Sequence, residues 1–199
     1  QHISDRMLKA MNRHGDGAMV RSVIKKLRAE VPGIVIRTTF IVGFPGETEE
    51  DFIELCEFVK EAKFEHLGVF PYSREEDTPA YDFEDQIDEQ IKQDRADIIM
   101  REQLEINTAN NEKMLNKTIT VLCEDYDPVA RVHFGRSAAD APEIDGKVYF
   151  RAEKRIAPGS FVRVKVREVV ELGSHGSFVK VKVRGVLDYD LMGRAITEN

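Results

Sequence analysis

The stretch Ile36-Arg-Thr-Thr-Phe-Ile-Val-Gly-Phe-Pro-Gly-Glu-Thr-Glu-Glu-Asp-Phe52 decides the fold of this chain. An apolar run from about residue 34 to residue 42 predicts a strand, and the Gly43-Phe-Pro-Gly46 turn ends it. Thr48 is a favourable N-cap, and Asp51 three positions later completes a variant of the capping box, so a helix begins here. A strand, a turn and a helix in this order indicate an α/β fold, whose ligands bind at the carboxyl ends of the strands.

The two faces of this strand differ, because alternate residues point to opposite sides. The face that can pack under helices carries Ile34, Ile36, Thr38, Phe40 and Val42. The opposite face carries Val35, Arg37, Thr39, Ile41 and Gly43. An arginine and a threonine on a second buried face suggest a polar interior, as in a barrel or a crevice that holds a charged ligand. An ion pair between Arg37 and an acidic neighbour explains the pattern equally well.

Helices and strands alternate through the first part of the chain. We expect a helix over residues 18–30, the strand described above, a helix from Thr48 to about Ala62, and a short strand over residues 66–71. This alternation predicts parallel strands with right-handed crossovers. A polar loop over residues 73–81 follows the second strand, and a long helix over about residues 87–115 closes this part.

From Lys117 onward the apolar period changes to two, which is typical of strands. The strongest pair of segments is 161–167 and 178–184, whose valines alternate with basic residues, and we expect them to be joined across residues 173–176. About five short strands with glycine turns predict a small closed β-barrel of the oligonucleotide-binding type. Closure is favoured because it removes exposed strand edges.

Charge divides the chain at the same place. Residues 1–115 carry a net charge of −9 and residues 116–199 a net charge of +2, against −7 for the whole chain. We therefore predict two domains, 1–115 and 116–199. Basic side chains on the outer face of the second domain could contact nucleic-acid phosphates, or they could form an ordinary solvated face. They are Arg163, Lys165, Arg167, Lys180, Lys182 and Arg184.

Composition excludes several classes of protein. The 199 residues are 42% hydrophobic and 33% charged, which indicates a globular domain. No apolar run approaches the roughly 20 residues that span a bilayer, so we expect no membrane segment.

Cys56 and Cys123 lack neighbours at metal-ligand spacing, and we expect buried thiols in a reducing cytoplasm. The opening Gln1-His2, directly before a capped helix, suggests that the domain begins upstream.

An acidic loop interrupts the otherwise basic second domain. Asp140, Glu143 and Asp145 fall between two predicted strands, and Asp145-Gly146 is a favourable turn. Ordinary loop chemistry explains part of this pattern. The carboxylates could also steer a basic protein partner.

Several of these motifs together resemble one family. The opening Gln1-His2 with Ser4-Asp5, the block from Arg37 to Thr48, Tyr72-Ser73 followed by Thr78-Pro79-Ala80, and the terminal barrel are similar to the radical S-adenosylmethionine methylthiotransferases. The resemblance covers essentially the whole chain. It corresponds to the second half of a partial TIM-type barrel, followed by a five-stranded TRAM barrel. Residues 135–146 and 188–193 resemble the branch that modifies an aspartate of small-subunit ribosomal protein twelve.

The resemblance implies a transferase with S-adenosylmethionine and two 4Fe-4S clusters as cofactors. One cluster is held by a Cys-x3-Cys-x2-Cys loop and the other by three cysteines of an amino-terminal domain. Neither cysteine set occurs in this sequence, so we expect no catalytic residue and no metal ligand here, and no activity from this chain alone. The cluster ligands are expected upstream.

The resemblance also assigns candidate binding residues. The strand from Arg37 to Gly43 would line the adenosyl pocket through Arg37, Thr39, Ile41 and Gly43. Asp140, Glu143 and Asp145 would attract the basic ribosomal protein. The alternative is a methylthiotransferase acting on adenosine in transfer RNA, with the TRAM domain as an RNA-binding module. Salt-dependent RNA affinity of residues 116–199 would favour that alternative.

Overall fold

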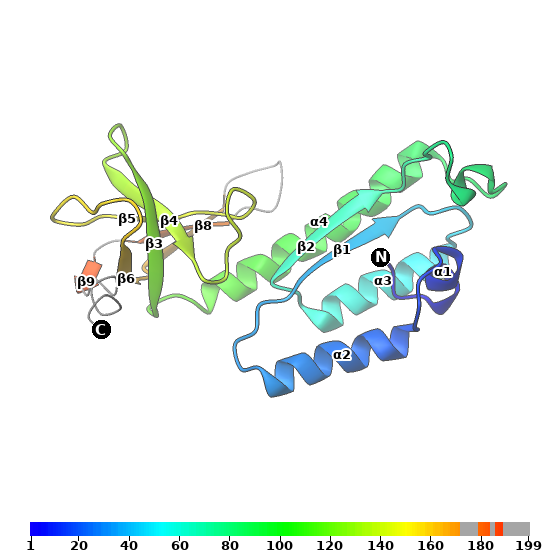
Figure 1. Ribbon diagram of the computed structural model, residues 1–199, viewed down its shortest axis with the longest axis horizontal. Helices are drawn as coiled ribbons and strands as arrows, with labels where there is room; N and C mark the ends of the chain where they lie inside the picture. The colour runs from blue at the N-terminus through cyan, green and yellow to red at the C-terminus, as the bar shows by residue number, and fades with distance from the viewer. Residues whose placement is uncertain (172–178, 184–185, 189–199) are drawn as a thin grey trace, which may run out of the picture. The chain divides into compact units, whose positions relative to one another are not determined.

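The chain forms two compact units, residues 1–107 and 108–199. The computed structural model describes residues 1–171, 179–183 and 186–188 (Figure 1). The division falls inside helix α4 (Glu89–Glu112), which continues past it. The predicted boundary between residues 115 and 116 stays a prediction.

The first unit follows the predicted alternation of helices and strands. Strands β1 and β2 pair in parallel, from Arg37 opposite His66 to Val42 opposite Pro71. The elements are α1 (Asp5–Ala10), α2 (Gly17–Glu30), β1 (Arg37–Val42), α3 (Glu49–Ala62), β2 (His66–Pro71), the 3-10 helix η1 (Pro79–Asp82) and α4.

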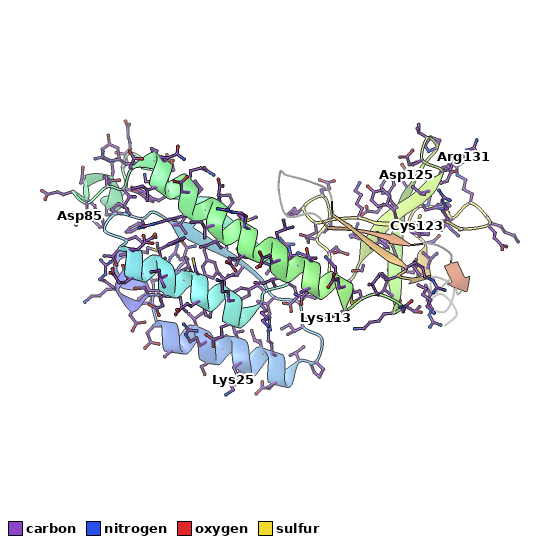
Figure 2. All side chains as sticks on the ribbon, turned by 180° about the vertical axis from the view of Figure 1, so that it is seen from behind. Lys25, Asp85, Lys113, Cys123, Asp125 and Arg131 are labelled. Carbon is purple, nitrogen blue, oxygen red and sulfur yellow. The ribbon has the colours of Figure 1, made fainter. Side chains whose placement is uncertain are left out.

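Helices cover one face of this two-stranded sheet. In Figure 1 the two strands lie in front of α4, and in Figure 2, the view from behind, the helices cover them. Phe40 and Val42 of β1 and Leu67 of β2 enter the core on that side. Three phenylalanine rings meet there edge to face, since the Phe58 ring centroid lies 5.7 Å from that of Phe64 and 6.2 Å from that of Phe40.

The opposite face of the sheet is open, which corrects one expectation. Arg37 and Thr39 are exposed and Ile41 is half-buried, although we predicted a second buried face. The physical reason is that all the helices that pack on β1 and β2 share the Phe40 side. In the described residues β1 and β2 form a two-stranded sheet, so the partial TIM-type barrel stays a prediction.

The second unit is a curled, mostly antiparallel sheet. Its described strands number seven rather than about five, in the order β7-β8-β5-β4-β3-β6-β9. Val121, Phe150 and Val164 are among its buried core residues. The strands are β3 (Thr118–Asp127), β4 (Val132–Ser137), β5 (Val148–Phe150), β6 (Phe161–Lys165), β7 (Glu168–Glu171), β8 (Val179–Val183) and β9 (Val186–Asp188).

The predicted pairing of the two valine-rich segments is wrong. β6 pairs with β3 and β9, whereas β8 pairs with β7 and, in parallel, with β5. The short strand β7 lies between the two segments in sequence and takes the antiparallel place beside β8. The predicted faces of β6 are confirmed, because Val162 and Val164 are buried and Arg163 is exposed. The predicted outer positions of the Lys180, Lys182 and Arg184 side chains fall outside the part of the chain whose side chains the structure describes.

Candidate cofactor and substrate sites

The turn after β1 is built for close packing. Gly43 has φ +71° and Gly46 φ +79°, a backbone region that glycine adopts without strain. A Cβ at Gly43 would stand 2.3 Å from Cγ of Lys92, a buried residue of α4. Gly43 therefore lets the end of β1 lie directly against α4.

Glu47 is a buried carboxylate at the centre of this turn. Its Oε2 accepts a hydrogen bond from the backbone N–H of Gly43 at 2.9 Å. Its Oε1 accepts from Nη1 of Arg95 at 2.6 Å, and both side chains are nearly inaccessible to solvent. A buried charge is tolerated only when it is paired and hydrogen-bonded, and Glu47 meets both conditions.

His2 reaches the same carboxylate from the start of the chain. Nδ1 of His2 accepts a hydrogen bond from the backbone N–H of Ser4 at 3.1 Å, so the ring proton of the neutral form sits on Nε2. Nε2 lies 3.5 Å from Oε2 of Glu47. The carbonyl of Gln1 accepts a bond from the N–H of Ile41 at 2.9 Å, so the first residues run along the edge of β1.

The predicted N-cap is confirmed in detail. The Thr48 hydroxyl accepts from the N–H of Asp51, and the Asp51 carboxylate accepts from the N–H of Thr48, which makes the capping box reciprocal. Burial raises the pKa of Asp51, but hydrogen bonds from Ser4, Thr48 and Arg6 outweigh burial and lower it to about 2. The helix after the turn therefore starts at a fixed residue.

Three of the four predicted adenosyl-pocket residues share one surface. Gly43, which follows β1, is instead buried against Lys92 of α4. Arg37, Thr39 and Ile41 lie on the open face of β1. Across the parallel register they stand beside His66, Gly68 and Phe70 of β2. We name these six residues the open face: Arg37, Thr39, Ile41, His66, Gly68 and Phe70.

This surface carries apolar and polar groups side by side. The Phe70 ring is 62% exposed and Ile41 is half-buried, so both offer apolar contact to a flat base. Thr39 adds a hydroxyl, and Gly68 beside it leaves room for close approach. Sequence reasoning missed Phe70 and Gly68, although their even spacing in a short strand would have placed them together on one face.

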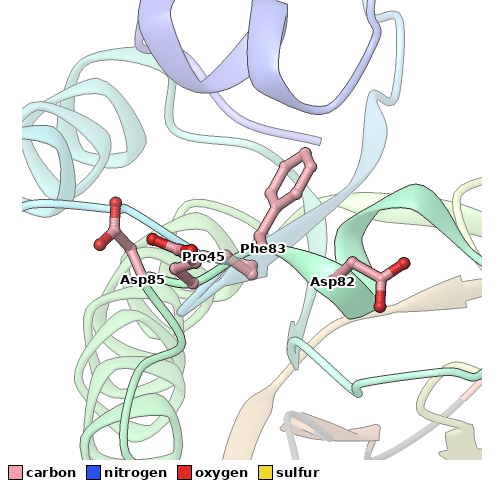
Figure 3. Close-up of a pocket in the computed structure, with 5 residues that line it drawn as sticks. Pro45, Asp82, Phe83 and Asp85 are labelled. Atoms are coloured by element: carbon pink, nitrogen blue, oxygen red, sulfur yellow. The ribbon is translucent and has the colours of Figure 1, made fainter.

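A pocket of about 440 Å³ lies beside the same turn (Figure 3). Pro45 and Phe83 are its apolar lining residues, and in the figure Asp82 and Asp85 point to opposite sides. The backbone N–H of Gly46 bonds the carbonyl of Asp85 at 2.8 Å and holds the loop to the turn. The lining residues are Pro45, Asp82, Phe83, Glu84 and Asp85.

The acidic loop of the second unit has internal partners. Asp140 accepts hydrogen bonds from the N–H of Ser137 at 2.9 Å and from its hydroxyl at 2.6 Å. Asp145 accepts from the N–H of Ala141 at 2.6 Å. Glu143 is exposed at φ +62°. Two of the three predicted substrate-binding carboxylates thus shape the loop, and Glu143 presents its charge to solvent.

Both cysteines are free thiols, of which Cys123 is buried and Cys56 is half-buried. Burial raises the pKa of Cys56 to about 11 and also raises the pKa of Cys123, so neither is a ready thiolate. Among the described residues, no three His, Cys, Asp or Glu side chains converge on a metal site. Within the described residues, no helix combines the length and the apolar character that crossing a membrane requires.

Comparison with known proteins identifies the class. Residues 1–59 match the model of the radical SAM superfamily, and residues 117–196 match that of the TRAM domain. The chain is therefore a radical SAM protein with a TRAM domain.

Three curated relatives share one name. All 199 residues align at 43% identity with the ribosomal protein uS12 methylthiotransferase RimO of Acetivibrio thermocellus, over 40% of that protein. The protein of that name from Pelotomaculum thermopropionicum is 49% identical over 84% of this chain and 38% of its own length. The one from Clostridium botulinum is 48% identical over 97% of this chain and 39% of its own. This chain is therefore similar to the ribosomal protein uS12 methylthiotransferases, and it spans about 40% of the length of these relatives.

Proposed function

We propose that the protein methylthiolates the β-carbon of an aspartate in ribosomal protein uS12. The observation that supports this proposal is the open face, which gathers an exposed aromatic ring, a hydroxyl and a close-approach glycine at the carboxyl end of a parallel strand pair. The relatives are named ribosomal protein uS12 methylthiotransferases. A reaction on a ribosomal protein would take place in the cytoplasm, so that location is part of the proposal.

The residues of this chain would bind and orient the cofactor. When bound, S-adenosylmethionine with a 4Fe-4S cluster supplies the radical that abstracts hydrogen from the target. Ile41 and Phe70 would pack against the adenine, and Thr39 would hydrogen-bond a polar edge of the nucleoside. Arg37 would attract a carboxylate. The proposal includes two 4Fe-4S clusters, whose ligands are not among these 199 residues.

Acidic surfaces suit a basic protein substrate. Three carboxylates line the pocket beside the turn, and Glu143 adds an exposed charge on the second unit. Ribosomal proteins are generally basic, and complementary charge speeds their encounter and suppresses wrong partners. The same surfaces would repel a nucleic acid at these positions.

One experiment tests the activity directly. The intact protein, reconstituted anaerobically with iron and sulfide, is incubated with S-adenosylmethionine, sulfide, dithionite as the electron donor and purified uS12. The uS12 peptides are then measured by mass spectrometry. We expect a mass gain of one methylthio group on an aspartate. Modified adenosine in a parallel reaction with transfer RNA, with unmodified uS12, would contradict the proposal.

A second experiment tests the substrate surfaces. Glu143→Gln removes an exposed charge without breaking a loop bond, and Asp82→Asn with Glu84→Gln removes two charges from the pocket. We expect weaker binding of uS12 in each case, most clearly at low salt. Equal binding by both variants would exclude these surfaces. Asp140→Asn is a poor probe, because it also removes the bonds to Ser137.

RNA contact through the second unit is a further proposal, carried by a separate observation. The Phe134 and Tyr149 ring centroids lie 6.1 Å apart, and Nζ of Lys147 stands 4.2 Å above the Phe134 ring. Half-buried aromatic rings beside a cation can stack with bases and contact phosphate. Salt-dependent binding of a ribosomal RNA fragment, lost in Tyr149→Ala, would support this contact as an aid to substrate docking.

A further inference from the structure

Capping of α3 does not explain the buried charge pair between Glu47 and Arg95. Asp51 and Thr48 already cap α3 without help from Glu47. Taking two charges out of water is unfavourable, so a buried charge pair at this position needs an explanation beyond capping. Arg95 also donates to the Glu47 backbone carbonyl at 3.3 Å, and its guanidinium lies 5.2 Å from the Phe52 ring centroid. The pair is therefore held from several sides.

What Glu47 holds is the turn directly after β1. Its Oε2 reaches back four residues to the N–H of Gly43 and closes the turn. Lys92 blocks any movement of Gly43 toward α4, because a single added carbon would already overlap its side chain. Gly43 is thus fixed by a charged acceptor on one side and by packing on the other. Gly43 directly follows β1, so fixing it holds the strand that carries Thr39 and Ile41 in place before a ligand arrives. Such preordering reduces the entropic cost of binding.

A neighbouring carboxylate shows that the arrangement is specific to Glu47. Glu49 also accepts a bond from Arg95, at 3.3 Å, but its side chain is 68% exposed. The N–H of Gly43 donates to Glu47. The two carboxylates therefore share Arg95 as a donor, and the bond that closes the turn is the one to Glu47. Glu49 is therefore a matched control for charge near Arg95.

We propose that Glu47 is a positioning residue for the cofactor-binding face: it acts through the N–H of Gly43, and Arg95 compensates its charge. This inference rests on the proposed function, because the open face is taken as the S-adenosylmethionine surface. Glu47 itself would not touch the cofactor. Its effect on binding would come through the fixed geometry of Gly43.

The chemistry of an amide gives a sharp test. A carboxylate has two acceptor oxygens and a carboxamide has one. Glu47→Gln therefore leaves either Gly43 or Arg95 without its acceptor. Adding Arg95→Met removes the competing donor, and the single oxygen of the new amide can then serve Gly43. The double variant also buries no unpaired charge, so it guards against a failure to fold.

The experiment uses the isotopically labelled 199-residue chain in two steps. Amide exchange of Gly43 is measured by NMR without ligand, and S-adenosylmethionine is then titrated and followed through the amides of Thr39 and Ile41. In Glu47→Gln we expect about tenfold faster exchange at Gly43 and about tenfold weaker binding, the effect of losing a hydrogen bond to a charged group. Glu49→Gln should match the unmodified chain. The double variant should recover most of both losses.

Each contrary result has a distinct meaning. Faster exchange at Gly43 with binding unchanged within about twofold would make Glu47 a structural residue only, and it would overturn the inference. Equal losses in Glu49→Gln, or no recovery in the double variant, would also overturn it. If the unmodified chain does not bind S-adenosylmethionine, the proposed cofactor surface fails, and unchanged exchange at Gly43 in Glu47→Gln would then reject the role of Glu47 as well.

Discussion

Replacing Asp51 by asparagine would measure how much one buried carboxylate stabilises the first unit. Asp51 accepts hydrogen bonds from the Ser4 hydroxyl at 2.5 Å and from the backbone N–H of Thr48 at 2.9 Å. It also pairs with Arg6. These contacts tie the segment before α1 to the start of α3. An asparagine at this position would keep the size of the side chain but lose the charge and one acceptor oxygen.

The pKa of Asp51 sets the magnitude. The pKa is about 2 in the folded chain against an ordinary value of 3.8. One pKa unit corresponds to about 1.4 kcal/mol, so the charged form contributes about 2 kcal/mol to the free energy of unfolding at neutral pH. The folded pKa is the lower one, and the contribution is therefore complete above pH 4 to 5. It is lost as the pH falls toward 2, with about 1 kcal/mol gone by pH 3.

Urea unfolding at several pH values between 6 and 3 provides the assay. The sequence has no tryptophan, and the described helices all lie within residues 5–112, so helical circular dichroism reports the first unit. We expect Asp51→Asn to lower the free energy of unfolding by about 2 kcal/mol at pH 6, and the difference from the unmodified chain to shrink by about 1 kcal/mol at pH 3. Glu54→Gln, an exposed site on the same helix, should change neither value. A difference that stays constant from pH 6 to pH 3 would refute the reasoning.

Three further predictions concern stability. Gly43→Ala should lower the free energy of unfolding by about 2 kcal/mol or more, because alanine is strained at φ +71° and its Cβ would overlap Lys92; an unchanged urea midpoint would contradict this. Phe58→Ala should cost about 3–5 kcal/mol by the same assay, since the ring is buried among other rings; a loss below about 1 kcal/mol would mean that the core refills the space. Burial and then the charge of Arg155 lower the pKa of His133 below 6.5 in the folded chain, so the second unit should lose stability as the pH falls from about 6.5 toward the folded pKa. His133→Gln, which can still accept from the N–H of Ile156, should remove that pH dependence, and thermal unfolding followed by tyrosine absorbance would show whether it does.

The local part of the fold could be predicted because its causes lie within a few residues. Thr48 and Asp51 are three positions apart, and their reciprocal bonds depend on that spacing alone. The two glycines of the turn likewise mark backbone positions that other residues resist. Parallel pairing of β1 with β2 followed from the alternation of helices and strands.

The buried polar residues could not be predicted in this way. α4 showed no clean apolar stripe, because its buried side carries polar side chains at helical spacing. Lys92, Arg95 and Gln103 are buried there, together with Ala96 and Ile99. Arg95 and Gln103 have partners from other parts of the chain, Glu47 and the carbonyl of Phe64, whereas Nζ of Lys92 pairs with Glu89 of the same helix. A search for apolar periodicity misses such a face, since charge compensation depends on residues far away in sequence.

Strand pairing in the second unit failed for a similar reason. The two valine-rich segments are alike in pattern, and pattern fixes which face of a strand is buried but not which strand lies beside it. Four residues of β7, too short to stand out in the sequence, provide the antiparallel partner of β8. The buried valines of β6 then face the core beside β3 instead.

The acidic loop shows what charge counting leaves out. Asp140, Glu143 and Asp145 are equivalent in the sequence, and a steering role could be assigned to all three. In the folded loop two of them accept backbone hydrogen bonds, and a carboxylate that is committed to a turn offers less of its charge to a partner. Glu143 differs because its charge is exposed. The proposal that charge attracts the substrate on this unit is therefore tested most cleanly at Glu143, where the folding role and the binding role separate.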